Sequence, residues 1–345
     1  MKRIEILKRA ILMEVLLIML AITINGMIPL LRSTSAQTGK KECIKWVEFH
    51  PTCEAMKYAY QTDVATHGTE DEINWISLLA YAAAKSGGNF DKNSVPLMRK
   101  LVGQIQDKET TFSKAVEKLE YYAYYQEAYE AVLGGMVGEF EIEEKDENGN
   151  VVFLKKYGLK AFLPIAQGFP YHDYDDFGSS RSFGYKRRHL GHDMMGQIGT
   201  PIIAVESGTV EAIGWNRYGG WRIGIRSFDK KRYYYYAHLR QNYPYQEGLK
   251  EGSIVTAGDV IGYMGHTGYS DKENVNNINV THLHFGMELI FDEKRREEGN
   301  EIWIDCYELT KFLYQNRSET VKKEGTKEWE RVYQMKDPEC EKYRN

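Results

Sequence analysis

Three short motifs in the second half of the chain carry histidines and an aspartate at spacings that suit metal chemistry. They are Arg188-His189-Leu190-Gly191-His192-Asp193, Tyr236-Ala237-His238-Leu239 and Thr281-His282-Leu283-His284-Phe285. Side chains an even number of residues apart on a strand share a face, so His189 and Asp193 project together while His192 projects oppositely. His282 and His284 share a face in the same way. Zinc takes imidazole nitrogen and carboxylate oxygen in a tetrahedron, so these strands predict a zinc site with one position left for water.

The remaining histidines of the motifs suit proton transfer beside such a metal. His238 ends a separate strand and could be the base that a zinc-bound water requires, and only one of His282 and His284 has to bind metal. The other is then free to act as a base or to hydrogen-bond a developing oxyanion. Zinc lowers the pKa of its water toward ~7, where an imidazole with a pKa of ~6.5 can transfer protons. The motifs therefore predict a metallohydrolase, and spacing alone leaves open which histidine of the third motif is the ligand.

The three motifs, in this order, resemble those of the LytM/lysostaphin-type zinc endopeptidases, which cut peptide bonds in bacterial cell walls. Members carry an H-x-G-x-D element, then Tyr-Ala-His-Leu, then His-Leu-His-Phe, and the resemblance extends from about Phe162 to Tyr314. It implies a compact, mostly antiparallel β fold of the duplicated-hybrid-motif kind, with a long groove for an extended peptide. One departure is the polar segment 269–281, which is longer than the usual connection before His-Leu-His. We expect it to form a loop beside the groove.

Carried over position by position, the resemblance assigns roles to the motif residues. It implies His189, Asp193 and His284 as ligands of one Zn²⁺ ion. It implies His238 and His282 as the catalytic pair, and peptidoglycan peptides as the substrate.

Aromatic and basic residues near the motifs are further candidates for the site. Tyr185 and Arg188 lie close to the first motif and could orient substrate, although ordinary strand packing and a solvated charge explain them as well. The run Tyr233-Tyr234-Tyr235-Tyr236 could form an aromatic platform. Because alternation sends two of these rings inward and two outward, we interpret the run mainly as a strand former.

The hydrophobic pattern divides the chain into a helical part and a β-rich part. Helical periodicity covers residues 42–137. The expected helices are Asp71–Ser86, one that starts near Pro96, and Phe112–Leu133. A tyrosine cluster in the last of these is expected to pack in the core. A hairpin of 139–143 and 151–155 then turns at an Asn-Gly pair. The later β-rich runs are Thr200–Val205, Thr209–Trp215, Trp221–Arg226, Arg232–Leu239, Ser253–Met264 and Thr281–Ile290. Residues Tyr307–Tyr314 are expected to form a short helix, and 319–345 a solvated helix or loose end.

We therefore predict an α+β multidomain chain. Its parts are an amino-terminal membrane anchor or signal segment (1–36), a small α-helical domain (37–137), a mostly antiparallel β domain with a substrate groove (138–314) and a charged tail (315–345). The helical domain has no assigned task, and a protein partner is one expectation for it.

The amino-terminal segment indicates export. Four basic residues within 1–9 precede the apolar stretch Ala10–Leu31, which approaches the roughly 20 residues that span a bilayer. The positive-inside rule then places the amino terminus in the cytoplasm and the other domains outside a bacterial cell membrane. Thr34-Ser35-Ala36 offers the alternative of a cleaved signal and a secreted protein. Export would permit disulfides among Cys43, Cys53, Cys306 and Cys340, with a local pair between the first two the simplest choice.

Composition excludes several other classes of protein. The chain has 345 residues, 45 Lys and Arg against 49 Asp and Glu, and 42% hydrophobic residues, which is globular and neither disordered nor collagen-like. The near-neutral charge provides no broad basic face, so no nucleic-acid partner is expected. Two rival functions stay open: a non-catalytic scaffold of the same fold that binds wall or protein, and a zinc peptidase of non-wall peptides. An enzyme is favoured over a scaffold because all five implied ligand and catalytic positions of the three motifs carry the expected histidine or aspartate.

Overall fold

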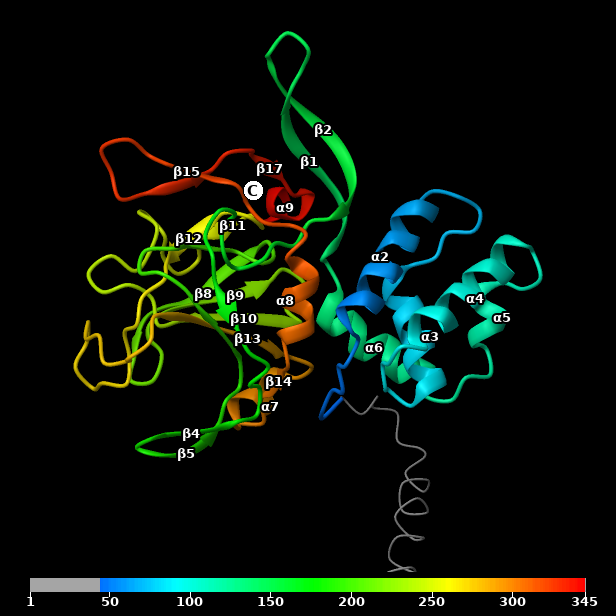
Figure 1. The fold of residues 1–345 in the computed structure, drawn as a ribbon, viewed down its shortest axis with the longest axis horizontal. Coiled ribbons are helices and arrows are strands. Elements are labelled where there is room, and N and C mark those ends of the chain that lie inside the picture. The colour runs from blue at the N-terminus through cyan, green and yellow to red at the C-terminus, as the bar shows by residue number, and fades with distance from the viewer. Residues whose placement is uncertain (1–43, 345) are drawn as a thin grey trace, which may run out of the picture. The chain divides into compact units, whose positions relative to one another are not determined.

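Helices fill the first part of the chain that the computed structural model describes, residues 44–344 (Figure 1). They are α2 (Cys53–Thr66), α3 (Trp75–Ser86), α4 (Ser94–Gln106), α5 (Phe112–Val116) and α6 (Tyr122–Leu133). Helix α3 starts at Trp75 because the Asn74 side chain accepts hydrogen bonds from two backbone N–H groups of the first turn. It ends at Gly87, which takes the left-handed conformation with φ 65°. The predicted start at Asp71 is therefore four residues early, whereas the helix beginning near Pro96 is confirmed.

The predicted continuous helix Phe112–Leu133 is wrong, because the chain breaks between α5 and α6. Tyr121 precedes α6 with φ 64°, a left-handed conformation that no helix continues through. The tyrosine cluster divides accordingly. Tyr125 and Tyr129 are buried against the other helices, as the packing interpretation predicts, while Tyr121 is 65% exposed.

A long β-hairpin follows the helices and matches the predicted turn. Strands β1 (Val137–Lys145) and β2 (Val151–Leu159) pair in antiparallel register from end to end, and β17 (Met335–Lys336) adds to the outer side of β1. Asp146 accepts backbone hydrogen bonds from Asn148 and Asn150 and so stabilises the turn. Both strands extend several residues beyond the predicted runs.

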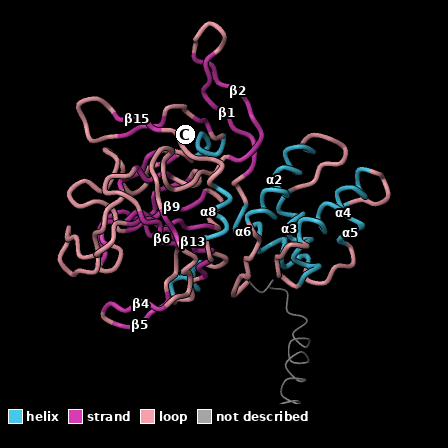
Figure 2. Tube along the Cα trace, in the orientation of Figure 1, coloured by secondary structure: helices cyan, strands magenta, loops and turns pink. Residues whose placement is uncertain are grey.

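The main sheet has eight antiparallel strands and carries the three histidine motifs. Strands are drawn in magenta in Figure 2. The order of the main sheet is β11-β8-β9-β10-β13-β6-β3, and β14 also pairs with β13. The strands are β3 (His172–Asp173), β6 (His192–Met195), β8 (Gly208–Asn216), β9 (Gly220–Ser227), β10 (Arg232–Ala237), β11 (Ile254–Val255), β13 (His282–Leu289) and β14 (Ile302–Ile304). Leu283 and Phe285 are fully buried on one face of β13, and Tyr234 and Tyr236 pack with them. The opposite face is left for the polar residues of the motifs. The α+β class is thus confirmed.

Three smaller pairs of strands surround this sheet. They are β4 (Ser180–Phe183) with β5 (Tyr185–Arg188), β7 (Pro201–Ile203) with β12 (Val260–Tyr263), and β15 (Thr320–Lys322) with β16 (Trp329–Arg331). The predicted single run Ser253–Met264 is wrong, since it forms β11 and β12 in two different sheets. Gly258, with φ 89°, makes the turn that separates them.

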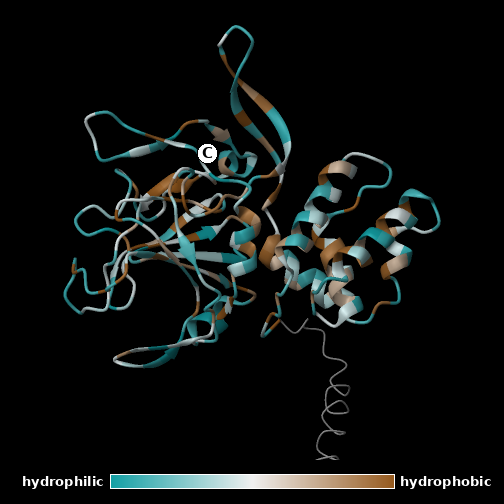
Figure 3. Ribbon diagram, in the orientation of Figure 1, coloured by the Kyte–Doolittle hydropathy of each residue, from teal (hydrophilic) through white to brown (hydrophobic). Residues whose placement is uncertain are grey.

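The carboxy-terminal residues return to pack on earlier elements. Helix α7 (Glu293–Glu297) precedes β14, and α8 (Tyr307–Leu313) follows it and inserts Phe312 against Trp75 and Tyr60 of the helical part. The prediction of a solvated or loose end after residue 319 is wrong. Helix α9 (Pro338–Arg344) buries Cys340, and Asp337 is buried in an ion pair with Lys160 at 2.9 Å. Hydrophobic segments occur on both helices and strands, whereas loops are mainly hydrophilic or neutral (Figure 3).

Two predictions concern the amino terminus and the cysteines. The segment 1–36 and Cys43 lie outside the described residues. Across 44–344, no helix is both long enough and apolar enough to cross a membrane. Within the same range Cys53, Cys306 and Cys340 are buried, and no two of them are bonded to each other.

A buried ion pair fastens the helical part to the main sheet and leads to a stability prediction. The Arg232 guanidinium, 1% exposed, donates to Glu206 at 2.8 and 2.9 Å and to the carbonyl oxygen of Ala131 in α6 at 3.0 Å. Replacing Arg232 by Met would leave the Glu206 carboxylate buried without its cation. We expect the free energy of unfolding to fall by about 3–5 kcal/mol, measured by denaturant titration. The exposed Lys250→Met is the control, and a loss for Arg232→Met as small as that control's would contradict the prediction.

Candidate metal centre and active site

Strand register brings the first and third motifs together. Strands β6 and β13 are antiparallel neighbours, and His284 pairs directly with Asp193. Cross-strand partners have side chains on the same face, so both project from the solvent side of the sheet. His189 lies before β6, at the end of the β4–β5 hairpin, where its backbone N–H donates to the carbonyl oxygen of Ser179 at 2.8 Å. The strand-parity argument therefore holds for β13, whereas His189 reaches the site from a loop.

The ligand atoms of the three residues meet at one point. His189 Nε2 lies 3.0 Å from Asp193 Oδ1 and 3.0 Å from His284 Nδ1, and His284 Nδ1 lies 2.9 Å from the same carboxylate oxygen. In a zinc tetrahedron with bonds near 2.0–2.1 Å, ligand atoms are roughly 3.3 Å apart. Two imidazole nitrogens and a carboxylate at these separations fit a zinc ion, and the structure brings the implied ligands His189, Asp193 and His284 into a group able to hold a metal.

Gly191 is the residue that lets His284 enter this group. A Cβ built on Gly191 would lie 2.5 Å from His284 Cε1, 2.6 Å from its Nε2 and 2.9 Å from the carbonyl oxygen of Phe285. Such approaches are far inside van der Waals contact. The glycine of the first motif is therefore a steric requirement, because the imidazole of His284 occupies the space that a side chain at position 191 would need.

A second layer of charged groups orients the ligands. Asp176 presents its carboxylate to His189 Nδ1 at 3.2 Å and its carbonyl oxygen to the same nitrogen at 3.3 Å. A proton on Nδ1 leaves the Nε2 lone pair free for metal, which is the usual role of a carboxylate behind a ligating histidine. Arg181 bridges the two carboxylates, contacting Asp176 and, at 3.2 Å, Asp193. Neither residue was identified from the sequence, although the acidic run 173–176 before the first motif was a usable signal.

Burial and charge together set the protonation of the ligands. Burial favours the neutral form of Asp193, but hydrogen bonds from His189 and His284 outweigh it and hold the pKa of this carboxyl far below its usual range. Burial lowers the pKa of His189, yet its hydrogen bonds to Asp176 and Asp193 raise it to about 9. Burial lowers the pKa of His284. In the metal-free chain Asp193 is thus an anion, which is the charge state that can bind a metal cation.

His238 and His282 lie beside the ligands with their rings close together. The ring centroids are 4.7 Å apart, and His238 is 5.8 Å from His284. His238 Nδ1 lies 2.9 Å from the carbonyl oxygen of Thr267, and His282 Nδ1 lies 2.8 Å from that of Val280. These contacts assign both protons to Nδ1 and leave each Nε2 as an acceptor. Burial lowers the pKa of His238 well below its ordinary value, so its ring is neutral at pH 7.

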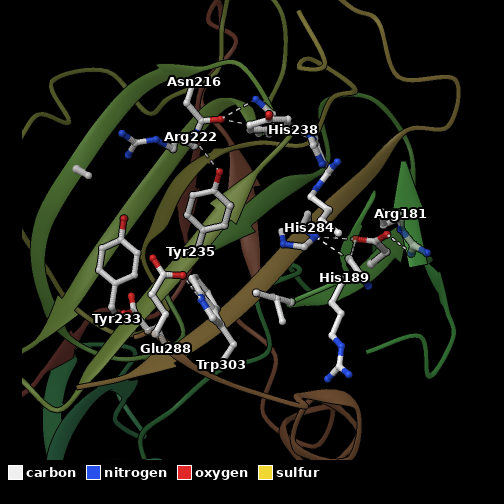
Figure 4. A pocket seen from close by; sticks show the side chains of 18 of the residues that line it. Arg181, His189, Asn216, Arg222, Tyr233, Tyr235, His238, His284, Glu288 and Trp303 are labelled. Atoms are coloured by element: carbon white, nitrogen blue, oxygen red, sulfur yellow. Dashed lines mark hydrogen bonds and ion pairs between the residues drawn. The ribbon is translucent and has the colours of Figure 1, made fainter. Parts of the chain in front are cut away.

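A groove of about 600 Å³ runs past these residues along the polar face of the sheet. In Figure 4, His189, His284 and Arg181 lie at one end, and Tyr233, Glu288 and Trp303 line the other. Tyr233 and Tyr235 are the outward pair of the tyrosine run, so half of that run does face the groove. Of the two substrate-binding candidates, Arg188 lines the groove, but Tyr185 is exposed at the hairpin tip and is not part of its wall.

Glu288 is a buried acid at the far end of the groove that the motifs do not reveal. Burial raises its pKa to about 7, although Arg296 at 3.1 Å opposes the shift. Strand parity could have found it, because it stands four residues after His284 and so shares its face. The expected loop at 269–281 is present, and its first residue, Tyr269, lines the groove. His192 is buried on the other face of β6, 3.0 Å from Asp173.

Comparison with known proteins agrees with this geometry. The sequence profile described as Peptidase family M23 matches residues 187–297, which contain all five motif residues of the site. Residues 187–297 belong to peptidase family M23. A stretch of 131 residues is 41% identical to the L-Ala--D-Glu endopeptidase of Bacillus subtilis and covers 38% of each protein. A stretch of 98 residues is 38% identical to lysostaphin of Staphylococcus simulans and covers 28% of this chain and 17% of lysostaphin.

A solved structure is also similar over most of the chain. It is a proposed glycyl-glycine endopeptidase from Ruminococcus gnavus, 25% identical, with a TM-score of 0.49, covering 80% of this chain and 93% of that one. The chain spans about two fifths or less of the length of the curated relatives named above.

Proposed function

We propose that the chain is a zinc-dependent endopeptidase that hydrolyses a peptide bond in bacterial peptidoglycan. The convergence of His189, Asp193 and His284 on one point, beside the paired rings of His238 and His282 in an open groove, carries this proposal. Membership of a metallopeptidase family supports it. When bound, zinc would act as a Lewis acid on the scissile carbonyl and lower the pKa of water toward ~7.

The chain's own residues would perform the positioning and the proton transfers. His189, Asp193 and His284 would hold the ion, with Asp176 fixing the tautomer of His189. His238 offers Nε2 as the acceptor for a proton from water, since its Nδ1 proton is engaged by a backbone carbonyl. Once protonated, the same atom can pass the proton to the leaving amine. His282 is oriented in the same way, and its Nε2 lies 3.7 Å from Asp193 Oδ1 at the edge of the site.

The stem peptide is the part of peptidoglycan that we propose as substrate. The stretch shared with the L-Ala--D-Glu endopeptidase is longer and more similar than that shared with lysostaphin. The bond between an alanyl and a glutamyl residue is therefore the first choice. We further propose that the chain acts outside a bacterial cell, anchored by the apolar stretch Ala10–Leu31 or released after its cleavage.

Mass spectrometry of fragments released from purified peptidoglycan tests the proposed function. The zinc-loaded full-length chain should generate new peptide termini, which disappear on chelation and return when zinc is restored. His238→Ala should release no fragments while retaining zinc. Failure of the folded, zinc-loaded chain to release any fragment from several wall types would overturn the proposal and favour a non-catalytic scaffold or a non-wall substrate.

A further inference from the structure

Arg187 is held rigidly in the wall of the groove by aromatic rings. It stands on β5, and its guanidinium lies 4.9 Å from the ring centre of Tyr218 and 5.3 Å from that of Tyr269. Its Nη2 donates to the Tyr269 hydroxyl at 3.0 Å. Phe183 stacks on Tyr269 at 4.7 Å and closes the cluster from the hairpin side. The cation is therefore pre-organised before any ligand arrives.

No anion satisfies this cation within the described part of the chain. The nitrogen Nη1 is buried and has no hydrogen-bond partner, and no carboxylate of residues 44–344 lies within ion-pair distance of Arg187. Two other groove arginines differ in this respect. Arg181 pairs with Asp193, and Arg296 pairs with Glu288 and Glu211. A buried guanidinium nitrogen without an acceptor is unfavourable unless a ligand supplies one.

The unpaired cation lies close to the catalytic histidines. The ring of Tyr269, which contacts Arg187, is 6.0 Å from the ring of His238. Arg187, His238 and His282 line the same groove. One aromatic ring thus separates Arg187 from a catalytic histidine, close enough for a substituent beside the scissile bond to meet the guanidinium.

We propose that Arg187 binds a carboxylate of the peptide substrate beside the scissile bond and so selects acidic peptides. This inference rests on the proposed function and deepens it. The planar guanidinium donates two parallel hydrogen bonds to a carboxylate, whereas a carboxamide accepts through one oxygen and presents an N–H₂ that Arg187 cannot accept from. Arg188 and Arg222 also line the groove with no ion pair in the described residues and reinforce its positive potential. A glycyl-glycine peptide offers no group for these charges.

Two peptides that differ in one group provide the test. The first is N-acetyl-L-alanyl-γ-D-glutamyl-L-lysine, whose glutamyl residue has a free carboxylate, and in the second that carboxylate is a carboxamide. With the zinc-loaded full chain, we expect kcat/KM to be about tenfold to a hundredfold higher for the acid. Arg187→Gln should remove this preference mainly by raising KM for the acid, leave the amide almost unchanged and retain full zinc content. Arg187→Lys should keep part of the preference, because it keeps the charge without the planar fork.

Lys186→Gln is the matched control, since it removes one positive charge from the next residue, which is exposed and absent from the groove wall. It should leave the preference unchanged. Equal cleavage of both peptides by the unmodified chain, or an acid preference that persists in Arg187→Gln, would overturn the inference and leave the proposed function standing. Cleavage of neither peptide, together with intact peptidoglycan, would overturn both.

Discussion

Replacing Gly191 by alanine will weaken zinc binding while the rest of the chain stays folded. The added methyl group would come within 2.5 Å of the His284 ring and 2.9 Å of the Phe285 carbonyl oxygen, and both are fixed by strand β13. The ring has to move, and its Nδ1 then leaves the point that it shares with His189 and Asp193. We expect zinc affinity to fall by about tenfold to a hundredfold or more, measured by competition with a coloured chelator. Peptidase activity should fall with it.

Stability provides a check that the effect is local. Overpacking of this kind destabilises by about 1–3 kcal/mol, which a domain of this size can absorb. Gly103→Ala in helix α4 is the matched substitution, because a Cβ there meets nothing within 4 Å and the backbone is helical. That variant should bind zinc normally and unfold at the same or a higher temperature. Unchanged zinc affinity in Gly191→Ala would contradict the steric role assigned to the glycine.

The sequence predicts the residues of the site better than their placement. Parity on β13 correctly sets His282 and His284 on one face and Leu283 in the core, because a two-residue period is a local property of any strand. His189 instead reaches Asp193 through the turn at Gly191, and no local rule states how such a turn folds. The resemblance to a family distinguishes His284 from His282, which spacing leaves equivalent.

Long-range contacts account for what sequence analysis misses. Arg181 and Asp176 contact the ligands because strand β4 pairs with β5, which brings residues 176–181 beside His189. The sequence predicts that the charged segment after residue 319 is solvated, because it shows the charges of that segment but not the residues that pair with them. Asp337 is buried because it meets Lys160 and Ser207 from distant strands. Arg187 likewise gains its significance from Tyr218 and Tyr269, which are far from it in sequence.

Separate substitution of the two histidines of the third motif will show that one is required for zinc binding and the other for catalysis alone. In His284→Gln the zinc group loses one of its three ligand atoms, so zinc content and activity should be lost together. In His282→Gln the three atoms that meet within 3.0 Å stay in place, so stoichiometric zinc should be retained. The loss of a positioned imidazole should nevertheless lower kcat by about 10²–10⁴-fold.

Metal analysis and kinetics on the same preparations distinguish the two histidines. His50→Gln, an exposed histidine remote from the motifs in sequence, is the control and should retain both zinc and turnover. The assignment of metal ligand and catalytic residue depends on what each Nδ1 atom contacts. His284 Nδ1 lies 2.9 Å from Asp193, whereas His282 Nδ1 lies 2.8 Å from the Val280 carbonyl oxygen. If His282→Gln lost zinc while His284→Gln kept it, His282 would be the zinc ligand and His284 the catalytic residue. If both variants kept zinc and full activity, the metal centre would have to lie elsewhere in the groove.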